Sequence, residues 1–116
     1  MYRSLYAYNM DTLYARIECT REDAMLEKEI EKKLRERMKE IGGFCYKWVS
    51  PGNAGVPDRI CIFPSGRVVF VEVKRKNGRL SAVQRVQIER LRRCRQEVAT
   101  IWSVQGVDRM VEEMMR

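Results

Sequence analysis

The chain has 116 residues, of which 45% are apolar and 34% charged, and its formal net charge is +7. This length suits a single domain with one modest core. No stretch approaches the ~18 consecutive apolar residues of a membrane span, and the first residues contain neither the apolar run nor the small-residue cleavage site of a signal peptide. We therefore expect a cytoplasmic protein with no membrane partner.

The residue types exclude several kinds of site. Histidine is absent, which removes His-centred zinc sites, Ser-His-Asp triads and Cys-His dyads. Four cysteines are widely spaced without a C-x-x-C pair: Cys19, Cys45, Cys61 and Cys94. Because nothing else indicates secretion, we expect four reduced thiols rather than a disulfide framework.

Residues 1–23 differ from the rest of the chain. They contain four of the five tyrosines and show no sustained apolar period, so we assign them as an N-terminal extension of uncertain structure and place the domain at residues 24–116. Over residues 24–41, apolar side chains recur every three or four positions, which predicts a helix. Gly42 and Gly43 then provide a helix stop.

Three strands are predicted next, over residues 44–49, 59–63 and 67–74. The third is apolar on both faces until its last residues, as expected of a central strand. Turn-forming residues separate the strands, with SPGNAGVP over 50–57 and a Pro-Ser-Gly turn over 64–66.

The second half of the chain predicts a helix over 82–96 with Ser81 as its N-cap, a strand over 98–104 and a short helix over 107–115. The first three strands can form an antiparallel meander, and the fourth returns through the helical crossover. The expected fold class is therefore α/β: helix, three strands, helix and strand around a small mixed sheet, followed by a C-terminal helix.

Two charged side chains lie on the otherwise apolar third strand. Glu72 and Lys74 share a face with Val68 and Phe70, because side chains two residues apart on a strand point the same way. Burying these charges is costly unless something pairs them. One such partner is a divalent cation that Asp58, before the second strand, also holds; oxygen ligands favour Mg²⁺ or Mn²⁺. The alternative is a Glu72–Lys74 ion pair without catalysis, which leaves Asp58 unexplained.

A glutamine lies where the second predicted helix begins. Gln84 falls on the core-facing stripe with Ile88 and Leu91. A polar group in that position needs a partner, and the charged groups of the third strand are the nearest candidates. Gln87 lies on a flanking line of the helix and is the weaker candidate.

Positive charge is concentrated between residues 59 and 95. This span contains eleven basic and two acidic side chains, whereas the rest of the chain contains twelve basic and fourteen acidic ones. A localised basic field suits a polyphosphate partner. For the arginines between residues 90 and 95, a solvated helix face is the alternative.

Together these motifs resemble a known family. GVPDR (55–59), EVK (72–74) and GRLSAVQ (78–84) are similar to the VRR-NUC domain of the PD-(D/E)xK nuclease superfamily, in its small stand-alone phage and bacterial form. The resemblance covers residues ~25–115. It implies a restriction-endonuclease-like core and metal-dependent hydrolysis of phosphodiester bonds in DNA, in the cytoplasm of a bacterial cell or a phage-infected host.

The resemblance also implies roles for the charged residues. Asp58 and Glu72 would hold Mg²⁺ or Mn²⁺, and the backbone carbonyl of Val73 could supply a further oxygen. Lys74 would orient or deprotonate the attacking water and stabilise charge growing on the phosphate. The physical chemistry agrees, because a bound metal lowers the pKa of water and a partly desolvated lysine is a tunable base.

Two further catalytic positions follow from the family pattern. Gln84 would be its motif glutamine, and an acid from the first helix would complete the site. Glu31 matches that pattern better, while Glu27, one turn earlier on the same side, remains open.

Residues around the site are candidates for contacts to DNA phosphates: Lys47, Ser50, Asn53, Arg59 and Lys76. Similarity to stand-alone VRR-NUC proteins implies a homodimer that cuts branched DNA such as Holliday junctions, because symmetric incision requires two sites related by a two-fold axis. We expect no small-molecule cofactor. The alternatives are a nickase or flap nuclease that needs a partner, and a non-catalytic nucleic-acid-binding module. The intact carboxylate, lysine and glutamine set favours an enzyme.

Overall fold

The computed structural model describes residues 21–116, so most of the expected extension at residues 1–23 lies outside the described residues. The described elements are α1 (Arg21–Glu40), β1 (Phe44–Lys47), β2 (Arg59–Ile62), β3 (Val68–Val73), α2 (Ala82–Arg93), β4 (Glu97–Ile101) and α3 (Val104–Met114). Their order and type confirm the predicted α/β fold class.

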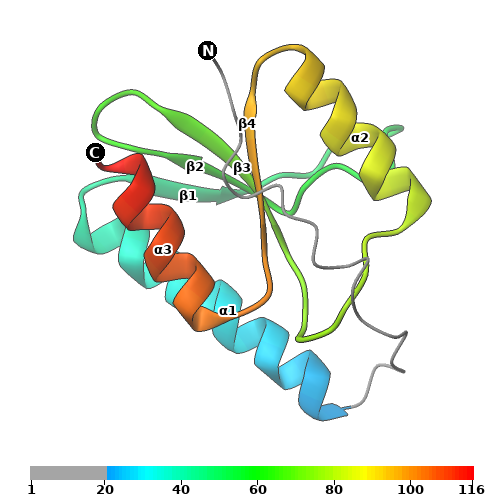
Figure 1. Cartoon of the computed structure of the whole chain (residues 1–116), viewed down its shortest axis with the longest axis horizontal. Helices are drawn as coiled ribbons and strands as arrows, with labels where there is room; N and C mark the ends of the chain where they lie inside the picture. Colours follow the sequence, from blue (N-terminus) through cyan, green and yellow to red (C-terminus); the bar gives the residue numbers. More distant parts are fainter. Residues whose placement is uncertain (1–20) are drawn as a thin grey trace.

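The four strands form one mixed sheet in the order β1-β2-β3-β4. β1, β2 and β3 pair antiparallel as a meander, and β4 pairs parallel with β3 after the crossover through α2. Figure 1 shows α2 connecting the two parallel strands. The predicted topology is confirmed, and β3 is an inner strand, as its apolar sequence requires.

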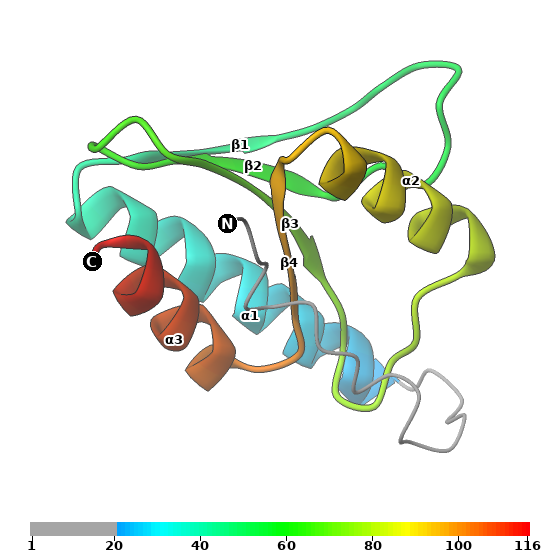
Figure 2. The ribbon, with the colours of Figure 1, turned by 45° about the horizontal axis from the view of Figure 1, so that its top comes forward.

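Two helices cover one face of the sheet and the third covers part of the other (Figure 2). The apolar stripe of α1 supplies Ile30, Leu34 and Met38 to the main core, where each is at most 3% exposed. The inward residues of β3 and the apolar face of α3 complete this core. An ion pair also ties α1 to α3, with Arg37 Nε 2.9 Å from Asp108 Oδ1. The main core therefore lies between the sheet and the two helices α1 and α3.

The structure corrects two predicted boundaries. The apolar run at 98–104 predicts a strand to residue 104, but β4 ends at Ile101 and α3 already begins at Val104. The Ser103 hydroxyl accepts a hydrogen bond from the Gly106 N–H, so this residue is a helix cap. Helix α2 ends at Arg93 because Arg95 takes a left-handed φ of +64°.

The described cysteines are free thiols. Cys45 and Cys61 face each other across β1 and β2, and the hydrogen bond between their thiols, followed by burial in the core, raises the pKa of Cys61. Cys19 lies outside the described residues. Within residues 21–116, every helix is too short or too polar to cross a membrane.

Candidate active site

Glu72 lies at the centre of the candidate site. It is 2% exposed, on the face of β3 that looks toward α2. Its Oε2 accepts a hydrogen bond from Gln84 Nε2 at 3.0 Å and lies 3.7 Å from Lys74 Nζ. Its Oε1 is buried and has no hydrogen-bond partner among the described residues. The ion pair with Lys74 therefore satisfies only one of the two carboxyl oxygens.

Asp58, the residue directly before β2, lies beside Glu72 of β3. Its Oδ2 accepts a hydrogen bond from the Val73 N–H at 3.1 Å, and its own carbonyl accepts one from the Trp48 N–H at 2.8 Å. These bonds hold the end of the 50–57 loop against β3. Fourteen positions apart in sequence, Asp58 and Glu72 are brought together by the antiparallel pairing of β2 and β3.

The two carboxyl groups affect each other's protonation. Burial, followed by repulsion from Asp58, raises the pKa of Glu72 to about 8. Burial also raises the pKa of Asp58, and the nearby charge of Glu31 acts in the same direction. A site that raises the pKa of two adjacent carboxyl groups favours a cation as the missing partner.

Gln84 connects α2 to the buried carboxyl. Its side-chain Oε1 accepts a hydrogen bond from the Ser81 backbone N–H at 2.8 Å. The backbone N–H of Gln84 donates to the Ser81 hydroxyl at 3.1 Å, and the two bonds form a capping box. The other end of its amide donates to Glu72. The predicted contact between Gln84 and the charged groups of the third strand is thus present, and its orientation is fixed by the helix cap.

The 50–57 loop packs against the start of α2. Gly55 has φ +86°, and a Cβ there would lie 2.5 Å from Val83 Cγ1. One turn further along, Gln87 Nε2 donates to the Ala54 carbonyl at 3.0 Å. The sequence does not predict this contact, because the offset of Gln87 from the core stripe makes it only the weaker candidate for the charged groups of the third strand. The bond between Gln87 and the Ala54 carbonyl fixes the position of the loop, and therefore of Asp58, relative to Gln84.

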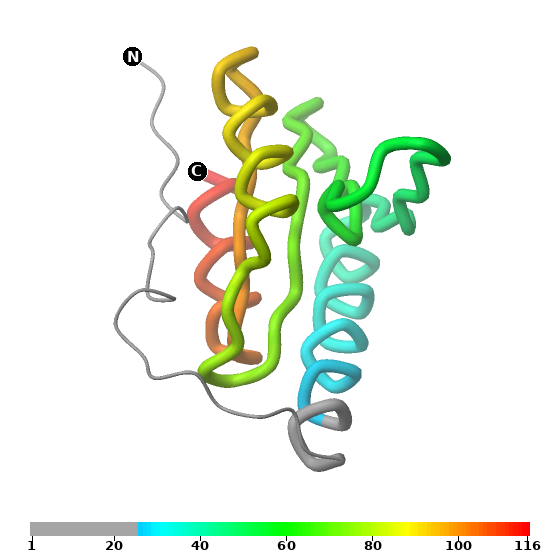
Figure 3. The backbone as a smooth tube through the Cα atoms, turned by 90° about the vertical axis from the view of Figure 1, so that its right-hand side faces the viewer, coloured from blue at the N-terminus to red at the C-terminus, as the bar shows by residue number. Residues whose placement is uncertain are grey.

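Both candidate acids of the first helix lie beside the site. Glu27 Oε2 accepts from the Arg75 N–H at 3.0 Å, and burial raises the pKa of its carboxyl. Glu31 pairs instead with Arg59, whose Nε lies 3.3 Å from Glu31 Oε2. Figure 3 shows the turn after β3 next to the coloured part of α1, in keeping with the bond between the Arg75 N–H and Glu27. Glu27 therefore approaches the strand that carries Glu72 and Lys74, while Glu31 approaches the start of β2.

The five predicted phosphate contacts differ in availability. Lys47 and Lys76 are exposed. Asn53 is also exposed, and its Nδ2 donates to the Ser50 hydroxyl at 3.0 Å within the loop. The side chain of Arg59 is 13% exposed and committed to its ion pair. Arg59 is therefore better placed to orient Glu31 than to meet a phosphate.

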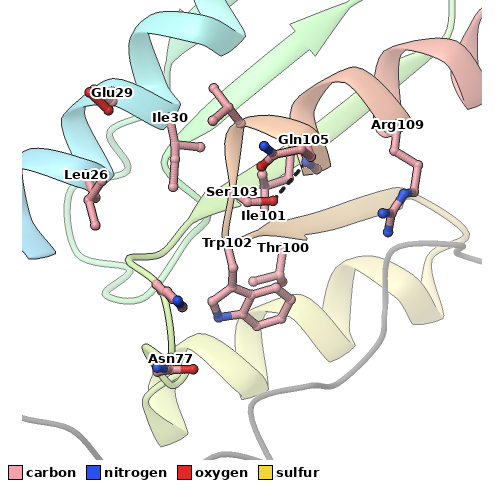
Figure 4. A pocket seen from close by; sticks show the side chains of 13 residues that line it. Leu26, Glu29, Ile30, Asn77, Thr100, Ile101, Trp102, Ser103, Gln105 and Arg109 are labelled. Atoms are coloured by element: carbon pink, nitrogen blue, oxygen red, sulfur yellow. Dashed lines mark hydrogen bonds between the residues drawn. The ribbon is translucent and has the colours of Figure 1, made fainter.

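A cavity of about 530 Å³ lies at the end of β4, between the first turns of α1 and α3 and the turn after β3. Figure 4 shows Leu26, Asn77, Trp102 and Arg109 around it. Lys76 also lines it, but Asp58, Glu72 and Gln84 do not. The cavity therefore flanks the candidate site and does not include the carboxyl groups of Asp58 and Glu72.

The donor set for a cation consists of oxygen atoms. Among residues 21–116, no group of three or more His, Cys, Asp or Glu side chains converges as a metal site. Two carboxyl groups with a backbone carbonyl are a smaller set, and such sets suit Mg²⁺, which keeps several of its waters. The unpartnered Oε1 of Glu72 beside Asp58 fits a cation of this kind.

Comparison with known proteins agrees with this fold. The family model described as "VRR-NUC domain" matches residues 6–105. A solved structure described as "VRR_NUC domain" has a TM-score of 0.70 and 33% identity, covering 74% of this chain and 94% of its own. Another, "VRR_NUC domain protein", has a TM-score of 0.60 at 16% identity, covering 74% and 84%, and shows the fold alone.

One curated relative comes from a phage. "Putative nuclease p44" of Acyrthosiphon pisum secondary endosymbiont phage 1 is 52% identical over 48 residues. The match covers 41% of this chain and 52% of the phage protein, so it spans about half of that relative's length.

The mixed sheet with its three helices is the fold shared with the VRR_NUC domain. Because the family model matches most of the sequence, the chain belongs to the VRR-NUC domain family, as its motifs predicted. The match begins at residue 6, inside the segment expected to be an extension, while the described helix α1 begins at Arg21.

Proposed function

We propose that the protein is a metal-dependent DNA endonuclease of the PD-(D/E)xK type, with Asp58 and Glu72 as its metal-holding carboxylates. One observation carries the proposal. Glu72 is buried next to a second carboxyl group, and one of its oxygens is left without a partner. A carboxylate buried in this way is costly unless a cation completes its environment.

Mg²⁺ or Mn²⁺ fits the residues present. The Oε1 of Glu72, the Asp58 carboxylate and the Val73 carbonyl would hold it, and Asp58 already reaches the backbone of Val73 through the hydrogen bond at 3.1 Å. When bound, such a cation lowers the pKa of a coordinated water and neutralises charge on a phosphate. The raised pKa values of both carboxyl groups would return toward their ordinary values in the presence of the positive charge.

The remaining side chains have distinct tasks. Lys74, 18% exposed and next to Glu72, would orient the attacking water and stabilise charge on the scissile phosphate. Gln84 would hold Glu72 Oε2 so that Oε1 stays directed at the cation. Glu31 remains the proposed acid of the first helix, with Glu27 as its alternative, since each lies beside one edge of the site.

The finer features of the function are also part of the proposal. Lys47, Ser50, Asn53 and Lys76 would contact DNA phosphates, and Arg59 would do so only if its pair with Glu31 opens. A homodimer would place two such sites for symmetric cutting of branched DNA. The phage relative is consistent with action in the cytoplasm of a bacterial host.

The test is a cleavage assay with the full chain. Labelled linear, nicked, flap and four-way-junction DNA are incubated with Mg²⁺, Mn²⁺ or EDTA, using wild type, Glu72→Gln and Lys74→Ala. We expect cutting only with metal, and a loss of at least a hundredfold in either variant. Glu36→Gln is the matched control, since that carboxylate is exposed on α1. Cutting in EDTA, or full activity of Glu72→Gln, would refute the mechanism.

Further outcomes separate the alternatives. DNA binding without cleavage under all metal conditions would favour the non-catalytic binding module. Cutting of only one strand of a junction would favour the nickase. Sedimentation at the mass of a single 13.8 kDa chain would exclude the homodimer.

A further inference from the structure

We propose that Phe44 and Tyr46 form a stacking surface for unpaired DNA bases next to the candidate active site. The proposal rests on the proposed nuclease function and specifies its substrate: DNA that presents unpaired bases close to the scissile phosphate. The two residues lie on the face of the sheet that α2 leaves partly uncovered.

The two faces of the sheet are covered very differently. On the face toward α1 and α3, the side chains that β2, β3 and β4 contribute to the main core are at most 2% exposed. On the other face, Phe44 is 55% and Tyr46 is 56% exposed. Figure 2 shows that α2 lies over one end of the sheet and that no described helix covers β1 on this side.

The two rings are arranged to receive a flat partner. The rings stack on each other, with centroids 5.8 Å apart and planes that differ by 15°, so a base would extend this stack on an outer face. Aromatic side chains on an open sheet bind single-stranded nucleic acids in this way, because every unpaired base has a face to stack. Bases inside a duplex are already stacked and paired, so this surface favours unpaired DNA.

The aromatic row is continuous with the site. Tyr46 pairs with Ile60, and Ile60 with Phe70, so these residues share the face that also carries Glu72. Trp48, two residues beyond Tyr46, packs on Phe70 with ring centroids 5.1 Å apart. From Trp48, whose N–H bonds the Asp58 carbonyl, back to Phe44 is about 13 Å at ~3.3 Å per residue. This is the length of about four stacked nucleotides.

The exposed area argues against a second copy of the chain as the occupant. An aromatic side chain buries at most about 250 Å², and Phe44 and Tyr46 are each only a little more than half exposed as whole residues. By themselves the two rings offer far less than the ~800 Å² per partner of a stable interface, so a second copy would have to bury much more of the chain than this surface. Lys47, exposed at the end of β1 nearest Asp58, points to the opposite face of this edge strand, where its positive charge suits the backbone of a nucleic-acid strand that runs along the sheet edge.

The test measures binding without cleavage. A short duplex and the same duplex with a single-stranded tail carrying 2-aminopurine are titrated with the full chain in EDTA, and again in Ca²⁺. We expect tighter binding to the tailed DNA, with 2-aminopurine quenched by stacking. Tyr46→Ala should weaken binding to the tailed DNA about tenfold and restore its fluorescence, with little change for the duplex. Tyr46→Phe should behave as wild type.

Controls and contrary results are equally specific. Met115→Ala, on a side chain 49% exposed beyond α3, should leave both affinities unchanged. Equal wild-type affinity for the two DNAs, or an equal loss on both in Tyr46→Ala, would overturn the proposal. A drop in sedimentation mass in Tyr46→Ala would show that the surface joins two copies and would also overturn it. Failure of the wild type to cut any DNA would refute the nuclease while leaving this binding result intact.

Discussion

At the scale of single residues, Glu72 is the centre of the candidate site. It is a carboxyl group on an inner strand, held by Gln84 on one oxygen and unpartnered on the other. A protein keeps such a group only where a ligand or a proton compensates for its burial. Two predictions follow from the groups that touch it.

The first prediction concerns stability against pH without metal. The pKa of Glu72 is about 8 in the folded chain and has an ordinary value of 4.5. Between these values the folded state holds a proton that the unfolded state has lost, so the free energy of unfolding falls as pH rises from about 4.5 to 8. Glu72→Gln removes this loss. In EDTA we expect the variant to be more stable than wild type at pH 9, by about 3–5 kcal/mol, and the advantage to disappear near pH 4.

Thermal unfolding of both proteins across this pH range provides the measurement. Adding Mg²⁺ should raise the melting temperature of the wild type more at pH 8.5 than at pH 6, because the cation and the proton compete for the same carboxyl groups. A wild-type stability that is flat between pH 5 and 9 would contradict the raised pKa.

The second prediction concerns Gln84. Gln84→Glu keeps an oxygen for the Ser81 N–H but places a carboxylate where the amide now donates to Glu72. We expect cleavage to fall at least tenfold and its pH profile to move to higher pH, because a like charge raises the pKa of Glu72 further. Ser81→Ala is the control: it loses the cap, at about 1 kcal/mol, but retains the contact with Glu72. Equal losses of cleavage would assign the effect to the cap.

At the scale of elements, the site depends on how the 50–57 loop meets α2. The loop carries Asp58 at its end, and the helix carries Gln84 in its first turn. Gly55 packs directly on Val83, and Gln87 bonds the Ala54 carbonyl. These contacts set the distance between Asp58, at the end of the loop, and Gln84, on α2.

The third prediction compares two glycines of this loop. Gly55 and Gly52 have φ values of +86° and +82°, so alanine at either position costs about 1–2 kcal/mol. Only at Gly55 does the added Cβ meet other atoms, 2.5 Å from Val83 Cγ1 and 2.9 Å from its carbonyl oxygen. We expect Gly55→Ala to lower the free energy of unfolding by about 1–3 kcal/mol more than Gly52→Ala. Urea unfolding measures the difference, and equal values would mean that the loop shifts freely.

At the scale of the whole molecule, the charge of +7 is unevenly distributed along the chain. Acidic side chains pair with part of the positive charge: Arg59 with Glu31, and Arg67 with Glu97. The lysines that remain exposed near the site, Lys47 and Lys76, are available to a phosphate backbone.

The fourth prediction concerns the salt dependence of DNA binding. Lys76 is exposed in the turn after β3, on the rim of the flanking cavity. Lys76→Ala should lower the slope of log affinity against log salt by about 0.9 for duplex DNA, because one fewer counterion is released. Lys39→Ala, at the end of α1, is the matched control and should leave the slope unchanged. An unchanged slope in Lys76→Ala would remove this residue from the interface.

Much of the fold could be predicted because its signals are local. The helical period found Ile30, Leu34 and Met38, and the alternation along β3 placed Glu72 and Phe70 on one face. Turn residues located the loop before Asp58. Where local signals compete, the prediction was wrong: the apolar run through Ser103 favours a strand, yet a single hydroxyl that caps α3 ends it.

The partners of side chains could not be predicted in the same way. Periodicity placed Glu27 and Glu31 on the same side of α1 but could not show that one meets the Arg75 N–H and the other Arg59. Nor could it show that Gln87 reaches Ala54, since that contact depends on where a distant loop packs.

The sequence by itself determined the elements, their order and the residue types of the site, because backbone preferences and apolar periods act over a few neighbouring residues. Only the tertiary structure decided which oxygen of Glu72 stays unpartnered, which acid meets which base, and which half of the sheet is open to a ligand. These features depend on groups far apart in the chain, and their positions are set by the packing of the loop, α1 and α2 around one sheet.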